Sequence, residues 1–133
     1  MRNTFIVLPL LLLSACTLHA SFTPENGKLN DATVGVPYYD KINIFGGNVA
    51  SLKDYYGNVK PVADITPIDS GLYIQHCNDN LYDDNCLQIR GTPTKPGVVK
   101  VQVSGIFNIA TFQKSSEFDK TYTIIIKKSD ESS

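Results

Sequence analysis

The chain has 133 residues, of which 42% are hydrophobic and 19% are charged, and its formal net charge is −1. This length suits one domain rather than two, and the balance of apolar and charged residues is that of a globular chain. Proteins that bind nucleic acid through charge carry a basic excess, so no nucleic-acid partner is expected. Two histidines leave little material for a histidine-based metal or catalytic site.

The first 15 residues have the pattern of a bacterial secretory signal. Arg2 precedes an apolar run from Phe5 to Leu13. A helix needs about 20 residues to cross a bilayer, so this run is too short to span one. Its length suits the apolar region of a cleaved leader. Residues 1–15 are therefore predicted to be a signal peptide.

The run ends in Leu13-Ser14-Ala15-Cys16, which resembles a lipobox. In bacterial lipoproteins this sequence directs cleavage before a cysteine whose thiol carries lipid. The resemblance implies that Cys16 carries acyl chains such as palmitate, which anchor the protein stably in a membrane. Thr17 is not the aspartate that retains such proteins in the inner membrane of enteric-type bacteria, which implies the outer membrane. Its periplasmic and external faces both remain open, and the alternative is a plain cleaved signal with a chance cysteine.

Cys77 and Cys86 are predicted to form a disulfide. They are the pair that remains once Cys16 carries the lipid, and the compartment beyond the inner membrane is oxidising. The bridge would close a short loop and stabilise the fold by about 2–3 kcal/mol in the loop-entropy model. The alternative is a metal site, but the two cysteines and His76 provide too few ligands for one.

The chain after the signal is divided into three parts. Residues 16–28 are predicted to be the lipidated N-terminus and a tether, because they are rich in turn-forming residues and show little periodicity. Residues 29–128 form the globular domain. Residues 129–133 are a polar tail that is expected to fray.

The domain is predicted to be an all-β sandwich of about seven strands. No segment of ten or more residues has helical apolar spacing, whereas several short segments alternate or are β-branched. Turn signals roughly every 8–12 residues favour two packed sheets. The expected strands are residues 32–34, 38–45, 59–66, 72–77, 86–90, 99–112 and 121–127. Gly105 is expected to interrupt the sixth of these as a bulge.

Two turn motifs carry a family likeness. Val34-Gly35-Val36-Pro37-Tyr38 and the Gly91-Thr92-Pro93 turn that continues to Gly97 resemble, in order and spacing, the immunoglobulin-like domains of cadherin or dystroglycan type in bacterial surface proteins. Of that family's Leu-Pro-x-Gly-Leu segment, only Gly71 and Leu72 match. The resemblance covers about residues 31–128 and implies an immunoglobulin-like sandwich in an extracytoplasmic protein. Glycine tolerates positive φ and proline fixes φ, so these motif residues are expected to shape turns rather than do chemistry.

No enzymatic activity and no cofactor are predicted. His76 is the only histidine in the domain, and Asp79, Asp83 and Asp84 are close enough in sequence to orient its imidazole, with Ser70 nearby. A hydrolase needs a nucleophile, a base and oxyanion donors in register, and no motif for such a set is present.

The segment from Asn78 to Asn85 holds three carboxylates and three amides in eight residues. Calcium takes 6–8 oxygen ligands, which makes this loop a candidate cation site. The segment lacks the Asp-x-Asp-x-Asp-Gly spacing of a helix–loop–helix site, and Asn and Asp also dominate ordinary turns. A solvated hairpin tip is therefore preferred, and no metal is expected.

Tyr55, Tyr56 and Tyr82 are the aromatic candidates for binding, together with Asp83 and Asp84 in the acidic loop. Tyrosine is a rigid contact residue, although the absence of tryptophan weakens the case for sugar stacking. The alternative for the Tyr55–Tyr56 pair is that one ring packs on the sandwich and the other faces solvent.

These features together predict a non-enzymatic outer-membrane lipoprotein. Its domain would contact a protein or a glycan at the cell envelope, in adhesion or in envelope assembly. The alternative is a periplasm-facing immunity or inhibitor lipoprotein that binds a toxin or enzyme by inserting the disulfide-braced acidic loop into a basic cleft. A spacer without a dedicated ligand is the third hypothesis.

Overall fold

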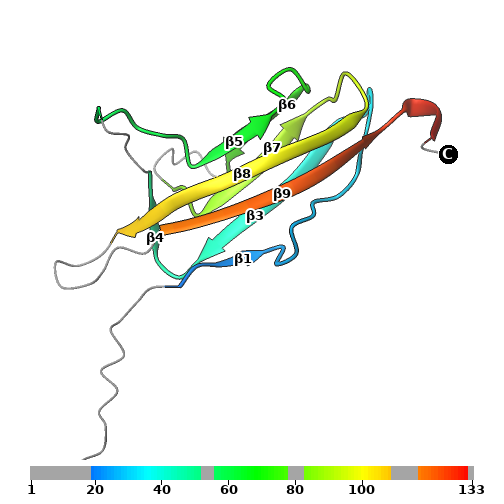
Figure 1. Cartoon of the computed structure of the whole chain (residues 1–133). Coiled ribbons are helices and arrows are strands. Elements are labelled where there is room, and N and C mark those ends of the chain that lie inside the picture. The colour runs from blue at the N-terminus through cyan, green and yellow to red at the C-terminus, as the bar shows by residue number, and fades with distance from the viewer. Residues whose placement is uncertain (1–18, 52–55, 78–82, 109–116, 132–133) are drawn as a thin grey trace, which may run out of the picture.

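Two β-sheets pack face to face in a computed structural model that describes residues 19–51, 56–77, 83–108 and 117–131 (Figure 1). The first sheet has the order β1-β3-β7-β6. Its strands are β1 (Ser21–Thr23), β3 (Tyr38–Phe45), β6 (Leu72–His76) and β7 (Cys86–Gly91). All neighbours in this sheet, the β3/β7 sheet, are antiparallel.

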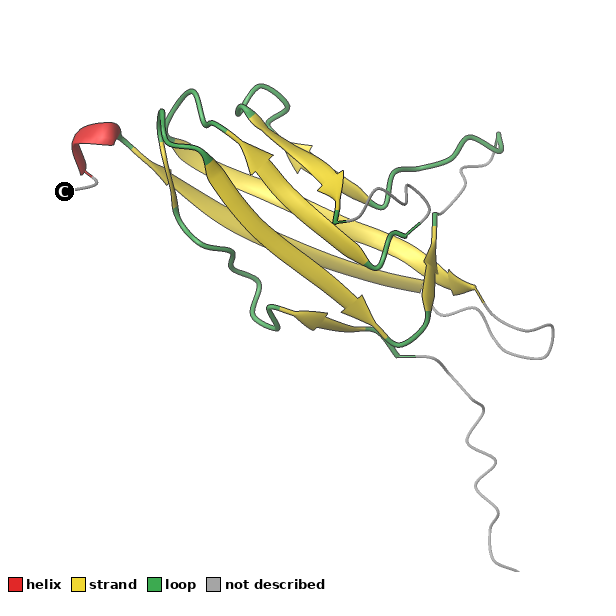
Figure 2. Cartoon of the chain, turned by 180° about the vertical axis from the view of Figure 1, so that it is seen from behind, coloured by secondary structure: helices red, strands yellow, loops and turns green. Residues whose placement is uncertain are grey.

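The second sheet, the β8/β9 sheet, has the order β2-β9-β8-β4, and β5 also pairs with β8. Its strands are β2 (Ala32–Thr33), β4 (Asn48–Ala50), β5 (Ala63–Thr66), β8 (Gly97–Asn108) and β9 (Glu117–Lys127). Only the short β2–β9 pairing is parallel among the strand pairings of the described residues. Figure 1 shows this sheet in front, and Figure 2 shows the molecule from behind. The prediction of an all-β sandwich with one disulfide is confirmed, with two short strands, β1 and β4, beyond those expected.

The core lies between the sheets and follows the two-residue alternation of the strands. The inward residues predicted for β8 and β9 are each at most 4% exposed, and they are Val99, Val101, Val103, Tyr122, Ile124 and Ile126. Ile42 and Ile89 face them from the other sheet with no exposed surface. Burying side chains of this size stabilises a fold by about 1.5–3 kcal/mol each.

Residues 21–28, which the sequence places in the tether, belong to the sandwich. Ser21–Thr23 pair with β3, and Phe22 packs edge-on against Phe118 with a centroid distance of 5.7 Å. The Tyr122 hydroxyl donates to the Pro24 carbonyl at 2.7 Å. Phe22 accounts for this difference, because its ring is the apolar side chain through which an otherwise polar segment packs against the sandwich. The tail differs as well, since Ser129–Glu131 form a single 3-10 turn.

Gly105 forms no bulge. The β8–β9 register runs without interruption from Ser104↔Asp119 through Gly105↔Phe118 to Ile106↔Glu117. A Cβ atom at Gly105 would lie 2.9 Å from the Ala50 carbonyl oxygen and 3.0 Å from the Phe118 ring. The glycine therefore allows a close approach of β4 and a core ring, which is a packing role that the sequence pattern does not reveal.

The two turn motifs meet at the end of the sandwich where β7 finishes. Gly35 N donates to the Pro93 carbonyl at 3.0 Å. Gly71 and Gly91 have φ of 91° and 121°, and a Cβ on Gly91 would lie 2.2 Å from the Gly71 carbonyl oxygen. Tyr38 is buried, and its hydroxyl donates to the Asn30 carbonyl at 2.7 Å. These residues shape turns and close packing, as the sequence predicts.

Candidate functional site

The predicted disulfide closes the β6–β7 hairpin at the opposite end of β7. Cys77 follows β6 and Cys86 opens β7, and their Cα atoms are 5.4 Å apart. The Cys77 amide also donates to the Cys86 carbonyl at 3.2 Å. The bridge joins two residues that the strand pairing already holds side by side, so it braces this corner of the sandwich.

Asn85 ties this corner to the turn between β3 and β4. Its side-chain amide donates to the Ile44 carbonyl at 2.9 Å and to the Gly47 carbonyl at 2.7 Å. Its side-chain oxygen accepts from the Val49 amide at 3.1 Å. In the sequence, Asn85 belongs to the oxygen-rich segment considered as a candidate cation loop. The structure instead uses the side chain to satisfy backbone groups of a neighbouring turn.

Asp83 and Asp84, predicted as binding residues, both make contacts within the corner. An oxygen of Asp83 accepts from the Asn85 amide at 3.1 Å. The carboxylate of Asp84 lies 2.6 Å from Nε2 of His76, and both side chains are about a quarter exposed or less. Of the aspartates that the sequence places near His76, Asp84 is the one whose carboxylate contacts the imidazole. Ser70 is not part of this pair, because it lies at the other end of β6, buried, with its hydroxyl accepting from the Leu72 amide.

The His76–Asp84 pair opens into a groove of about 500 Å³ beside the edge strands β5 and β6. The groove is lined by Ser51, Pro61, Val62, Ala63, Ile74, His76, Asp84 and Leu87. A second groove of about 290 Å³ shares Ala63 and Ile74 with it and continues along β6 to Tyr73. The imidazole of His76 and the carboxylate of Asp84 therefore lie beside the apolar side chains of the groove. Ser51 is the hydroxyl side chain that lines the same groove.

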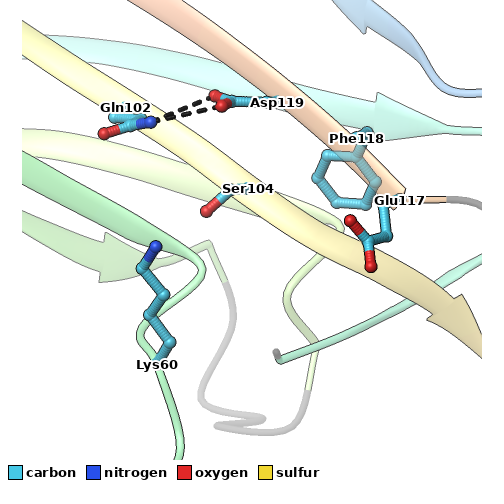
Figure 3. A pocket seen from close by; sticks show the side chains of 6 residues that line it. All are labelled: Lys60, Gln102, Ser104, Glu117, Phe118 and Asp119. Carbon is cyan, nitrogen blue, oxygen red and sulfur yellow. Dashed lines mark hydrogen bonds between the residues drawn. The ribbon is translucent and has the colours of Figure 1, made fainter. Parts of the chain in front are cut away.

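A smaller hollow of about 210 Å³ lies on the β8/β9 sheet (Figure 3). Its lining includes Lys60, Ser104 and Glu117. Gln102 donates to both carboxylate oxygens of Asp119, at 3.2 and 3.3 Å. The hollow therefore carries charges of both signs, and its Asp119 carboxylate is already hydrogen-bonded.

The other predicted site residues divide into those that the structure describes and those outside it. Tyr56 is 84% exposed, which agrees with an aromatic ring that faces solvent. Tyr55, Tyr82 and Cys16 lie outside the described residues, as does most of the candidate calcium segment. Within the described ranges, no three His, Cys, Asp or Glu side chains gather so as to hold a metal ion.

A row of side chains on the outward face of the β3/β7 sheet was not predicted from the sequence. In the strand register, Tyr39 and Tyr73 both lie opposite Arg90, from β3 and β6 respectively. The two rings are 52% and 53% exposed, and the Arg90 guanidinium carbon lies 5.5 Å from the centre of the Tyr39 ring. The alternation of residues 38–45 already turns Tyr39 outward, but only the register of three strands brings the row together.

The chain matches no protein-family model, no curated protein and no solved structure. The likeness to immunoglobulin-like domains stays a prediction from the turn motifs of the sequence. Among the described residues, no helix is long and apolar enough to cross a membrane.

Proposed function

We propose that this protein is a non-enzymatic outer-membrane lipoprotein whose immunoglobulin-like sandwich serves as a binding module at the cell envelope. The lipobox-like Leu13-Ser14-Ala15-Cys16 supports the anchor. The Cys77–Cys86 disulfide supports an oxidising compartment outside the cytoplasm. The proposal for binding is supported by half-exposed aromatic side chains on rigid strands, which a bare spacer does not need.

The observation that carries the proposal is where the described chain enters the sandwich. A Cβ on Gly46 would lie 2.3 Å from the His19 carbonyl oxygen, so His19 contacts the β3–β4 turn, which Asn85 also holds. The C-terminal turn lies at the opposite end of the sandwich (Figure 1). Three extended residues span at most about 10 Å. A lipid on Cys16 would therefore keep the disulfide corner near the membrane and direct the turn-motif end away from it.

This orientation also bears on the alternative of an immunity or inhibitor lipoprotein. That hypothesis requires Asp83 and Asp84 to enter a basic cleft of a toxin or enzyme. The Asp84 carboxylate already pairs with His76, and Asp83 accepts from the Asn85 backbone. A partner at this corner would also have to approach beside the membrane. The geometry therefore favours envelope contact through other surfaces.

The anchor is tested by labelling cells with an alkyne analogue of palmitate and comparing the wild type with Cys16→Ala. We expect label and outer-membrane fractionation for the wild type, and loss of both for the variant. A matched control, Cys77→Ser, Cys86→Ser, changes the other two cysteines and keeps the label. An unlabelled wild-type protein, or equal membrane association of Cys16→Ala, would refute the lipoprotein proposal. Protease digestion of intact and lysed cells carrying a C-terminal tag then distinguishes the external from the periplasmic face.

A further inference from the structure

Tyr39, Arg90 and Tyr73 lie side by side on three neighbouring strands, β3, β7 and β6, and are called here the tyrosine–arginine row. Tyr38, Ile89 and Leu72 next to them in sequence are buried, so strand alternation turns the row to the outward face. We infer that the row is the centre of a docking surface for a protein partner that presents carboxylate side chains.

The outward face of the β3/β7 sheet carries positive charge. Besides Arg90, the outward side of the sheet carries Lys41, two residues along β3 from Tyr39. The four strands contain a single carboxylate, Asp40, which is on the inward side and accepts from the Asn30 amide at 2.8 Å. The face is therefore cationic on a chain whose net charge is −1.

The cations on this face form no ion pair with the described residues, in contrast to some lysines elsewhere on the molecule. Lys95 pairs with Asp69 at 2.5 Å, and Lys127 pairs with Asp31 at 3.2 Å. Neither Lys41 nor Arg90 forms an ion pair with any residue that the structure describes. Carboxylates from outside are the complement that this surface lacks.

Arg90 is held in place before any partner arrives. Its guanidinium lies over the Tyr39 ring, and one of its nitrogens lies 3.5 Å from the Gln88 side-chain oxygen. A guanidinium presents its N–H groups in one plane and binds a carboxylate through two parallel hydrogen bonds. The contacts with the Tyr39 ring and the Gln88 oxygen restrict the guanidinium, which lowers the entropy lost on binding.

The aromatic side chains favour a protein over a glycan. The guanidinium already occupies part of the surface of the Tyr39 ring, which leaves Tyr73 as the open ring of the row for sugar stacking. Tyrosine and arginine are enriched at protein interfaces and among their strongest contacts. Amide side chains such as Gln75 and Gln88 provide the adaptable hydrogen bonds that accompany tyrosines in paratopes.

The size of the face sets the expected strength. Four strands at the usual spacing and six residues of β3 give a surface of about 15 by 20 Å. This is less than the roughly 800 Å² that each partner contributes to a stable complex. The contact is therefore weak and reversible, and it depends strongly on its few charged groups.

This inference rests on the proposed role as a binding module but does not need the lipid anchor. The test measures binding of the full-length protein, in detergent, to poly-L-glutamate at low ionic strength. Polygalacturonate carries carboxylates on sugar rings, and dextran is a neutral polymer, so these two probes separate the sources of binding. The variants are Arg90→Gln, Arg90→Lys, Tyr73→Ala and, as the matched control on the other sheet, Lys100→Gln.

We expect poly-L-glutamate to bind more tightly than polygalacturonate, and dextran not to bind. Arg90→Gln should weaken poly-L-glutamate binding about tenfold and Tyr73→Ala several-fold, while Lys100→Gln changes it less than twofold. Arg90→Lys keeps the charge but loses the planar fork, so it should fall between Arg90→Gln and the wild type. Thermal melting checks that each variant is folded.

Three outcomes overturn the inference. Tighter binding to polygalacturonate, lost in Tyr73→Ala, would make this a glycan surface. If Arg90→Gln and Lys100→Gln weakened poly-L-glutamate binding equally, the binding would depend on overall charge rather than on the tyrosine–arginine row. No binding of poly-L-glutamate by the folded wild type would remove the carboxylate partner. Failure of lipidation at Cys16 would leave all these measurements unchanged, so the two proposals fail separately.

Discussion

The outward faces of the two sheets differ, although both cover the same core. On the β8/β9 sheet, polar groups satisfy one another, as where Lys100 donates to Thr123 at 2.9 Å and Gln102 donates to Asp119. On the β3/β7 sheet, Lys41 and Arg90 meet no carboxylate among the described residues. Strand alternation requires polar outward residues on both faces, but it does not require the strands of one sheet to carry no outward carboxylate, as the β3/β7 sheet does. The difference therefore points to a surface kept for a partner.

The largest expected effect on stability comes from changes in the core between the two sheets. Ile89, next to Arg90, and Ile124 of β9 are both fully buried. Replacing either by alanine removes buried methyl groups and leaves a cavity, so we expect each to lower the free energy of unfolding by about 2–5 kcal/mol. Urea denaturation of the two variants measures this. If only one of the two variants were less stable than the wild type, the two sheets would not contribute equally to the core.

The disulfide is expected to have the next largest effect. Cys77→Ser, Cys86→Ser removes a cross-link whose partners are nine positions apart. The unfolded chain gains freedom, so the free energy of unfolding should fall by about 2–3 kcal/mol. Denaturation of the wild type with and without reductant provides the comparison. If reduction has no effect, Asn85 and the strand pairing alone hold the corner.

Tyr38 and Tyr122 are the inward tyrosines of the two sheets. They are expected to make the free energy of unfolding fall as the pH becomes alkaline. Burial, with the nearby Asp40 carboxylate as the smaller cause, raises the pKa of Tyr122 to about 12. Burial likewise raises the pKa of Tyr38. The unfolded tyrosine loses its proton near pH 10, so this stabilisation is complete below about pH 10 and is lost as pH rises toward 12. Unfolding free energies at pH 9 and pH 11 should differ less for Tyr122→Phe than for the wild type. An unchanged difference would mean that Tyr122 is not the group that titrates.

The outward residues should affect stability least. Tyr73→Ala, Arg90→Gln and Lys100→Gln change exposed side chains, and surface changes of this kind are usually within about 0.5 kcal/mol. Melting temperatures measure this directly. If Arg90→Gln lowers stability as much as the removal of a core methyl group, the tyrosine–arginine row serves the fold rather than a partner.

Most of the fold can be predicted from local pattern, because alternation and turn residues act over a few positions. Val99, Val101 and Val103 face the core for this reason. The roles of Phe22 and Gly105 depend on what lies across the sandwich, and no short segment contains that information. The same limit applies to surfaces, since Asn85 bonds to a turn 38 positions away and Tyr39 meets a residue about 50 positions later. The tyrosines favoured by sequence are those that lie in candidate loops, whereas the row on the β3/β7 sheet exists only through strand register.

A photo-crosslinking amino acid at Gln75, compared with one at Thr121, tests the difference between the faces most directly. Both positions are exposed, the first on β6 beside the tyrosine–arginine row and the second on β9 of the other sheet. After irradiation of intact cells that express the full-length protein, we predict one discrete protein adduct from position 75. The crosslinked segment of the partner should be rich in Asp and Glu, and Arg90→Gln should remove the adduct. Adducts of equal yield from both positions, or none from position 75, would contradict a partner surface on the β3/β7 sheet.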